Sequence, residues 1–300
     1  MQKVLITGGT GLIGKHLCVF LKTKGYEVRL LSRNQNLNSE YETFIWNIDK
    51  QIIDEKAFEN LDYIIHLAGA GIADKRWSKK RKEEIVRSRI QSTELLYKTV
   101  KKLQTPLKAF ISSSAIGYYG AISSDTIFKE DDKAGDDFIS NVCQLWEKAA
   151  FQFQQESIRT VAIRTGIVLS KKGGALSKMK TPIVTPIGSG KQYMPWIHMN
   201  DLCEIYRKAL EDINMTGVYN GVAPEHQTNA SFSKLLAKFI NRPFLSIAIP
   251  AFILKILFGE MAAILIYGSR ISSQKIQDVG FSFTYPKFDD ALKNLNQNEI

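Results

Sequence analysis

A glycine-rich stretch near the N-terminus carries the residues of this sequence best suited to binding a ligand. Gly8-Gly9-Thr10-Gly11-Leu12-Ile13-Gly14 follows the apolar run Val4–Ile6 and leads into an amphipathic stretch. Glycines let the backbone turn tightly and approach a pyrophosphate, and the N-terminus of a helix offers unpaired N–H groups and a positive dipole end. The order therefore predicts a dinucleotide site. Its predicted cofactor contacts are Gly8, Thr10, Gly11, Leu12, Ile13 and Gly14.

The end of the next predicted strand, Val28–Leu31, indicates which dinucleotide binds. NAD-binding proteins usually carry Asp or Glu there, about 20 residues after the glycines, to accept a hydrogen bond from the ribose 2′-hydroxyl. Here the strand ends in Ser32-Arg33-Asn34. A hydroxyl and a guanidinium bind a 2′-phosphate in charge-assisted hydrogen bonds, whereas a carboxylate repels it. The sequence favours NADP(H) held by Ser32 and Arg33; the alternative is that Arg33 is a plain surface charge.

The elements that must position these residues alternate along the first 165 residues. Short aliphatic and β-branched runs predict strands, and amphipathic stretches between them predict helices. We expect strands at 4–6, 28–31, 63–67, 109–113 and 160–164, and helices at 12–23, 78–102 and 138–156. Such alternation is typical of an α/β fold with a Rossmann-type, doubly wound parallel sheet.

Beyond residue 166 the regular alternation of predicted strands and helices ends, because glycines and prolines divide the chain into shorter segments. We expect an NADP-binding Rossmann domain over 1–165 and a mixed substrate-binding cap region over 166–300, with 245–297 as a distinct C-terminal segment. Further elements expected in this region are helices at 200–210 and 231–240 and a strand at 217–221.

Composition limits the classes of partner. The net charge is +10, but Lys and Arg are spread along the chain and form no basic stripe interleaved with aromatic residues, so we expect no nucleic-acid partner. The three cysteines, Cys18, Cys143 and Cys203, form no CxxC pair, and neither a disulfide framework nor a metal site is predicted.

The apolar stretch 245–267 is the one segment that raises the question of a membrane. Pro250, Lys255, Gly259 and Glu260 interrupt it, whereas a spanning helix needs about 20 residues with few charges. We therefore expect a buried or partner-facing helix pair and no membrane partner. The N-terminal residues read as a strand and a glycine loop and not as a signal peptide, so a cytoplasmic location is expected.

Several motifs together resemble a known family. They are His66-Leu67-Ala68-Gly69-Ala70, Phe110-Ile111-Ser112-Ser113-Ser114 leading to Tyr119-Gly120, Pro195-Trp196-Ile197-His198-Met199-Asn200-Asp201, Gly259-Glu260-Met261-Ala262, and Gly280-Phe281-Ser282-Phe283-Thr284-Tyr285-Pro286. With the glycine loop, these motifs resemble the extended short-chain dehydrogenases, in the atypical epimerase branch with a C-terminal domain of unknown function. The match covers essentially the whole chain.

The resemblance implies further cofactor contacts and a catalytic set. Leu67, Ala68 and Gly69 would lie beside the cofactor, and Asp49 sits where extended members place an acid that meets the adenine amino group, although a turn-forming Asp is an equal alternative. At the nicotinamide the class uses a Ser to orient the substrate oxygen and a Tyr-x-x-x-Lys pair for acid/base work. Ser114 matches the Ser position, with Ser113 next in line.

The Tyr-x-x-x-Lys pair is missing between residues 138 and 156. The best register puts Cys143 in the Tyr position and Glu147 in the Lys position. A carboxylate four residues away would raise the pKa of the Cys143 thiol, which argues against a reactive thiolate. The candidate catalytic residues are therefore Ser114, Cys143 and Glu147, with water as another proton source.

Three functions remain open at this stage. The first is an NADP(H)-dependent oxidoreductase acting on a small carbonyl or sugar-like molecule of unknown identity. The alternatives are a catalytically silent NADP-binding module and a nucleotide-sugar epimerase or dehydratase, the last opposed by the missing pair. The resemblance also implies a homodimer formed through 78–102 and 138–156.

Four further polar residues have structural interpretations beside the functional ones. His66 follows an apolar run and is expected to be a hydrogen-bonded core residue. Arg164, at a strand end, either lines the substrate cleft or forms a structural ion pair. His198 and Asp201 have no third ligand at metal spacing, so we assign them to cap structure or substrate contact.

Overall fold

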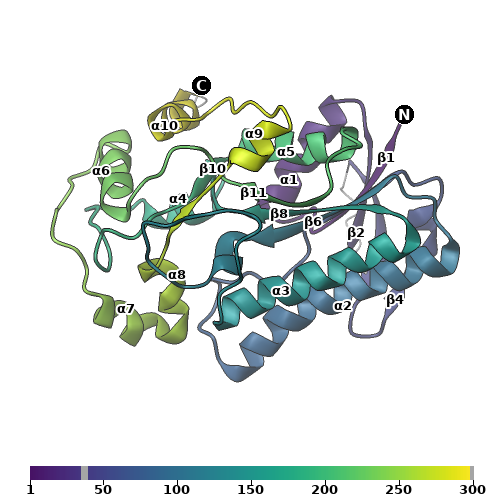
Figure 1. Ribbon diagram of the computed structural model, residues 1–300, viewed down its shortest axis with the longest axis horizontal. Coiled ribbons are helices and arrows are strands. Elements are labelled where there is room, and N and C mark those ends of the chain that lie inside the picture. Colours follow the sequence, from purple (N-terminus) through teal and green to yellow (C-terminus); the bar gives the residue numbers. More distant parts are fainter. Residues whose placement is uncertain (35–39, 298–300) are drawn as a thin grey trace.

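The computed structural model describes residues 1–34 and 40–297 and has a large parallel sheet at its centre (Figure 1). The sheet order is β11-β8-β6-β5-β1-β2-β3-β4, and the short β4 is the one antiparallel strand in it. The strands are β1 (Lys3–Thr7), β2 (Glu27–Ser32), β3 (Glu42–Asn47), β4 (Ile52–Ile53), β5 (Tyr63–His66), β6 (Ala109–Ala115), β8 (Arg159–Thr165) and β11 (Gly217–Gly221). The predicted Rossmann-type α/β fold is confirmed.

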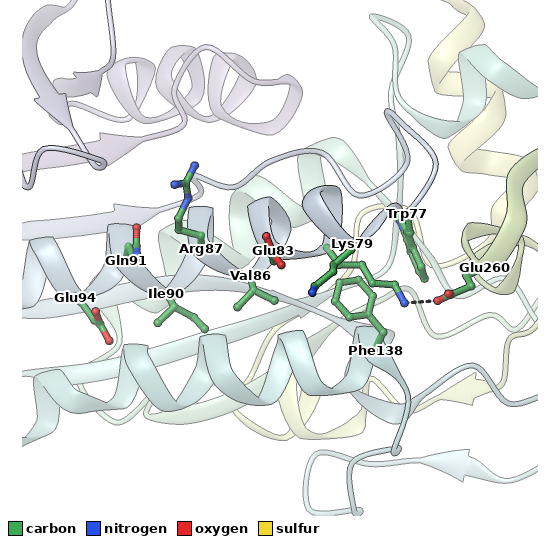
Figure 2. Close-up of a pocket in the computed structure, with 11 residues that line it drawn as sticks. Trp77, Lys79, Glu83, Val86, Arg87, Ile90, Gln91, Glu94, Phe138 and Glu260 are labelled. Atoms are coloured by element: carbon green, nitrogen blue, oxygen red, sulfur yellow. Dashed lines mark hydrogen bonds and ion pairs between the residues drawn. The ribbon is translucent and has the colours of Figure 1, made fainter.

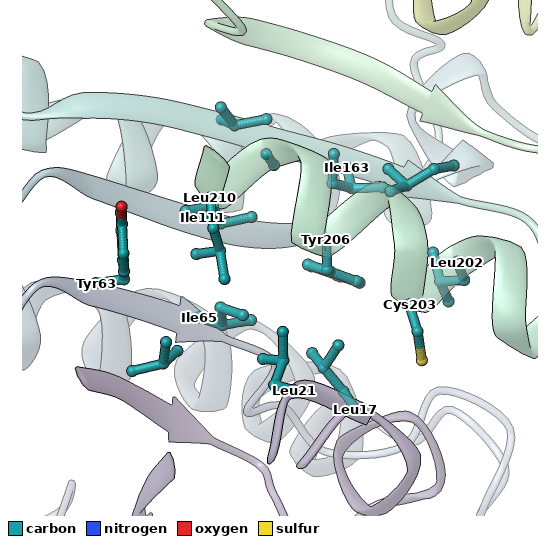
Figure 3. Close-up of a cluster of buried hydrophobic side chains, with 14 of the residues drawn as sticks. Leu17, Leu21, Tyr63, Ile65, Ile111, Ile163, Leu202, Cys203, Tyr206 and Leu210 are labelled. Carbon is teal, nitrogen blue, oxygen red and sulfur yellow. The ribbon is translucent and has the colours of Figure 1, made fainter. Parts of the chain in front are cut away.

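Helices cover both faces of the sheet because successive side chains along a parallel strand point to opposite sides. In β1, Val4 and Ile6 pack on one side against α1 (Leu12–Thr23) and α5 (Met199–Glu211), whereas Leu5 packs on the other. That other side is covered by α2 (Lys79–Leu103) and α3 (Phe138–Ala150), which run side by side. Figure 3 shows the first core, in which Leu17 and Leu21 of α1 meet Tyr206 of α5.

The predicted helix at 138–156 is shorter in the structure. Regular α-helix ends at Ala150, and residues Phe151–Glu156 form the 3₁₀ turn η3. The tighter winding places the ring of Phe153 on that of Phe110, with centroids 3.8 Å apart. Ser157 then adopts a left-handed conformation with φ of 58°, and the chain turns back into β8. The packing of Phe153 in the core thus coincides with the change from α-helix to 3₁₀-helix after Ala150.

The remaining elements are short helices and strands outside the main sheet, most of them after residue 166. They are η1 (Glu55–Phe58), η2 (Ile116–Tyr119), β7 (Ile127–Phe128), β9 (Ile167–Leu169), α4 (Ala175–Met179), β10 (Trp196–His198), α6 (Asn229–Phe239), α7 (Ala251–Phe258), η4 (Gly259–Ala262), α8 (Ala263–Ile266), β12 (Arg270–Ile271), α9 (Gln274–Asp278) and α10 (Phe288–Gln297). Trp196, Phe232 and Phe288 pack together as a core separate from that of the sheet. We call β9, β10, α4, α6–α8 and α10 with their loops the cap.

The region after residue 166 also contributes to the main sheet. Strand β11 pairs with β8 along its whole length, from Gly217 opposite Val161 to Gly221 opposite Thr165, and α5 packs on α1. The expected strand at 217–221 and helix at 200–210 are therefore present, but they belong to the sheet layers rather than to the cap. Among the described residues, no helix is long and apolar enough to cross a membrane.

His66 is a core residue, as the sequence indicates. Its side chain is fully buried between β1 and α2, where Nδ1 lies 2.7 Å from Thr7 Oγ1 and Nε2 lies 3.1 Å from Ser92 Oγ. Burial lowers the pKa of His66 to about 3, so the folded protein holds the ring neutral over the physiological range.

This pKa predicts a specific loss of stability in acid. Between pH 6.5 and about 3 the unfolded chain protonates His66 and the folded protein does not, so the free energy of unfolding falls with pH by up to about 1.4 kcal/mol per unit from this residue. Urea denaturation at pH 7.5 and 5 will show a steeper loss for the wild type than for His66→Gln. Equal slopes for the two proteins would contradict the assignment.

Candidate functional site

The glycine turn between β1 and α1 has the geometry of a dinucleotide cradle. Gly8 has φ of +70°, and a Cβ there would lie 2.9 Å from the carbonyl carbon of Leu67. A Cβ on Gly14 would lie 2.2 Å from the oxygen of Gly8, so the first turn of α1 packs directly on the loop. Gly11 is the N-cap residue of α1 and provides no side-chain cap, which leaves the helix N–H groups free for an anion. These residues fit a pyrophosphate.

The segment after β5 lies beside this cradle, as expected for Leu67, Ala68 and Gly69. Thr7 Oγ1, at the end of β1, accepts hydrogen bonds of 3.2 Å from the backbone N–H groups of Leu67 and Ala68. Gly69 follows in an exposed position. The carboxyl ends of β1 and β5 therefore form one edge, where parallel sheets of this type bind their ligands.

The predicted phosphate ligands lie at the end of β2. Ser32 is half-buried and its Oγ accepts a 3.3 Å hydrogen bond from the N–H of Asn34, while Arg33 is exposed. Within 1–34 and 40–297, no carboxylate lies within 4 Å of the Arg33 guanidinium. Asp49 lies in the turn after β3 and pairs with Arg87 of α2 at 3.3 Å.

A buried polar cluster lies where the resemblance places the catalytic residues. Ser114, in β6, donates a 2.7 Å hydrogen bond to Glu147 Oε1 of α3. Arg164, in β8, holds both oxygens of Glu147, with Nε 2.8 Å from Oε1 and Nη2 2.9 Å from Oε2. The parallel register sets Ser114 directly opposite Arg164. The side chains of Ser114, Glu147 and Arg164 are all buried. Two of the predicted catalytic residues, Ser114 and Glu147, are therefore in direct contact, and Arg164 forms an ion pair with Glu147.

Arg164 also anchors the residues around the cluster. Its Nη1 donates to Tyr119 Oη and to the carbonyl oxygen of Glu130, each at 3.0 Å, and its guanidinium lies 3.3 Å from the centroid of the Tyr118 ring. Burial opposes the charged guanidinium, but the hydrogen bonds and charge of Glu147 outweigh it and raise the pKa of Arg164. Arg164 therefore stays charged, in the structural ion pair that was one of its two expected roles.

The remaining acid/base candidates in this cluster stay protonated at neutral pH. Burial, together with the nearby Glu147 carboxylate, raises the pKa of the Cys143 thiol to about 12. Burial also raises the pKa of Tyr119 to about 12, although Arg164 opposes this, and Tyr119 Oη donates a 2.7 Å hydrogen bond to Asn220. Neither group is poised to take up a proton.

One charged residue of this region was not among the predicted site residues. Arg89 of α2 is half-buried, and its Nη1 donates to the carbonyl oxygens of Ala70 and Ile85 at 3.1 and 3.0 Å. Its guanidinium lies 4.9 Å from the centroid of Trp146, and a Cβ on Gly69 would come within 3.1 Å of it. No carboxylate of the described residues lies within 4 Å of Arg89. The sequence could have indicated this position, because Arg89 follows the buried Ile85 by four residues and so lies on the same face of α2.

The other singled-out residues have structural contacts. Asp201 accepts hydrogen bonds of 2.9 and 3.0 Å from the N–H groups of Thr284 and Tyr285, which ties the C-terminal segment to α5. In the part of the chain that the structure describes, no group of His, Cys, Asp and Glu residues could hold a metal ion. A groove of about 780 Å³ runs along α2 past Val86, Ile90 and Phe138 and contains none of the predicted cofactor ligands (Figure 2).

Comparison with known proteins agrees with this geometry. Residues 4–220 match the family described as NAD dependent epimerase/dehydratase, and residues 249–295 match a domain of unknown function (DUF1731). The epimerase family protein SDR39U1 of mouse (Mus musculus) is 35% identical over 302 residues, which is 98% of this chain and 99% of that protein. An epimerase family protein of Staphylococcus aureus is 33% identical over 302 residues, with the same coverage of both chains.

Solved structures show the same arrangement. The human epimerase family protein SDR39U1, crystallised with NADPH, superposes with a TM-score of 0.86 at 33% identity, covering 99% of this chain and all of that one. A nucleoside-diphosphate sugar epimerase from Corynebacterium glutamicum gives a TM-score of 0.78 at 29% identity, covering 97% of this chain and 57% of that chain. The resemblance seen in the sequence is confirmed.

The buried ion pair generates a prediction about stability. Glu147→Gln leaves the charge of Arg164 buried without its partner, and we expect the free energy of unfolding to fall by about 3–5 kcal/mol. Replacing both residues with apolar ones, Glu147→Leu with Arg164→Met, should cost less than the sum of the two single changes. Urea denaturation of Glu147→Gln, of the two single apolar variants and of their combination measures this, and strictly additive losses would exclude the coupling.

Proposed function

The chain belongs to the NAD-dependent epimerase/dehydratase family, and we propose from this premise that it is an NADP(H)-dependent oxidoreductase acting on a small carbonyl or sugar-like substrate. The observation that carries the proposal is the chain of contacts from Ser114 through Glu147 to Arg164, at the sheet edge that also holds the glycine cradle. The human relative crystallised with NADPH supports the choice of cofactor, as do Ser32 and Arg33.

The direction of the Ser114 hydrogen bond decides what this residue can offer a substrate. Glu147 is ion-paired and accepts only, so Ser114 must donate its proton to Oε1. The lone pairs of Ser114 Oγ are then left to accept a hydrogen bond from a substrate hydroxyl. The site in this state suits the alcohol form of a substrate.

This arrangement supplies a route for the proton of the reaction. When bound, the nicotinamide ring accepts or gives up the hydride. As an alcohol is oxidised to a carbonyl, its hydroxyl proton passes to Ser114 Oγ while Ser114 passes its own proton to Glu147 Oε1. Reduction of the carbonyl runs the same transfers backward. Arg164 holds the carboxylate in position in both directions.

A second candidate is an NADP(H)-binding module without turnover. The observation in its favour is that Cys143 and Tyr119 both have a pKa of about 12, while Glu147 is held on both oxygens by Arg164. If Glu147 cannot exchange a proton in that ion pair, the cluster serves only to hold the fold around a bound nucleotide.

Arg33→Asp tests the choice of cofactor. A carboxylate in this position repels a 2′-phosphate, and loss of one charge-assisted contact is worth about 1.5–3 kcal/mol, so we expect NADPH affinity to fall about 10- to 150-fold. Titration of nicotinamide fluorescence measures it, with NADH affinity as the internal control. NADPH binding as tight as that of the wild type would refute the assignment of Arg33.

Ser114→Ala tests the proton route. We expect turnover to fall by about 10²- to 10⁴-fold with NADPH affinity unchanged, because the substitution removes only the hydroxyl between substrate and Glu147. Oxidation of NADPH with a panel of carbonyl compounds is the assay, and Ser113→Ala, one residue earlier in β6, is the matched control. Selective NADPH binding with no turnover of any compound by the wild type would favour the silent module.

A further inference from the structure

The cap ends in an apolar surface that the proposed function does not use. Phe252, Ile253, Ile256 and Leu257 of α7 are all exposed, Phe252 by 63% and Ile256 by 68%. Around the helix axis these four fall on one broad arc, and Leu254 alone is buried on the opposite side. Figure 1 shows α7 at the lower left rim of the molecule. A helix this apolar on its outer side is unusual for a surface exposed to water.

Neighbouring loops extend the same surface. The segments 183–187 and 243–249 run side by side, with hydrogen bonds of 2.9 Å from Leu245 N–H to Val184 O and from Gly188 N–H to Ile249 O, and α7 follows directly. Ile183 and Ile247 are exposed in these segments, Ile247 by 70%. We call Ile183, Ile247, Phe252, Ile253, Ile256 and Leu257 the cap-tip surface.

The chain segments that carry the cap-tip surface have charges of one sign. Residues 165–200 contain five Lys and residues 226–259 contain four Lys or Arg, and neither segment contains a single Asp or Glu. Lys180, Arg242 and Lys255 are exposed beside the apolar residues, and none of them has a carboxylate within 4 Å among residues 1–34 and 40–297. The nearest acid along the chain, Glu260, is paired with Lys82 of α2.

These observations distinguish between possible occupants. A second copy of the chain would bring the same unpaired cations face to face, and like charges oppose such contact. The apolar arc of α7 lies on the outside of the molecule, at its rim (Figure 1), so its side chains can insert into a lipid layer. Apolar side chains beside Lys and Arg are the composition that binds the headgroup region of an anionic bilayer, where cations are attracted and apolar side chains insert.

We propose that the cap-tip surface docks the protein on an anionic lipid bilayer, with Phe252, Ile256 and their neighbours inserted at the headgroup level and Lys180, Arg242 and Lys255 against the lipid phosphates. This contact departs from the expectation of no membrane partner, which rested on the lack of a spanning helix; a surface contact of this kind needs no span. Docking through the rim of the cap would leave the glycine cradle, at the sheet edge, open to its ligand.

Vesicle co-sedimentation tests the proposal on the intact protein. We expect it to sediment with vesicles of phosphatidylcholine containing about one-third phosphatidylglycerol and to stay in solution with pure phosphatidylcholine. Phe252→Ser with Ile256→Ser should weaken partitioning about tenfold or more, and Lys255→Glu about fivefold or more. Added salt should weaken the wild type more than Lys255→Glu.

The control is Ile213→Ser, which removes a single side chain that is 81% exposed between α5 and β11. It should bind vesicles like the wild type, and all variants should keep the wild-type unfolding midpoint. Failure of the wild type to sediment with anionic vesicles, or equal binding by the double serine variant, would overturn the proposal. So would a wild-type dimer that the double serine variant abolishes, since a second copy would then be the occupant.

Discussion

Glu147 and Arg164 form an ion pair that is buried from solvent, and the neighbouring elements provide the hydrogen bonds that stabilise it. Removing two charges from water is costly, and only dense hydrogen bonding offsets the cost. Here Nε and Nη2 of Arg164 hold the carboxylate, and Nη1 is satisfied by Tyr119 and a backbone carbonyl. Helix α3, strand β8 and turn η2 are thereby fixed to one another, and through Asn220 the contacts reach β11.

The pair also relates this protein to the wider dehydrogenase class. The resemblance implies a cation on α3 at position 147, one turn after a tyrosine. In this chain α3 carries the carboxylate, and the cation comes from β8, the strand opposite Ser114. A positive charge is thus retained beside Ser114, but it is supplied by a different element and is neutralised within the protein. Arg89, against Trp146 and next to Gly69, adds a second guanidinium on the α2 side.

Local sequence patterns predicted the cradle and six of the eight strands of the main sheet, all except β3 and β4, for a physical reason. Strands buried on both faces are continuous apolar runs, and the turn between β1 and α1 admits little besides glycine. Local patterns did not predict features that depend on residues distant in the sequence. The end of α3 depends on Phe110, which packs on Phe153, and the partner of Glu147 depends on the register between β6 and β8. Neither can be read from residues near 147 or 153.

The path of the chain between the layers has a consequence for how the protein folds. After β8 it enters the cap with β9, returns to the sheet with α5 and β11, re-enters the cap with α6 and returns again where α9 packs on β11. The edge strand β11 therefore cannot be added until the first cap segment has been synthesised. Contacts of such long sequence separation slow folding and couple the layers, so we expect sheet and cap to assemble as one cooperative unit rather than as two independently folding bodies.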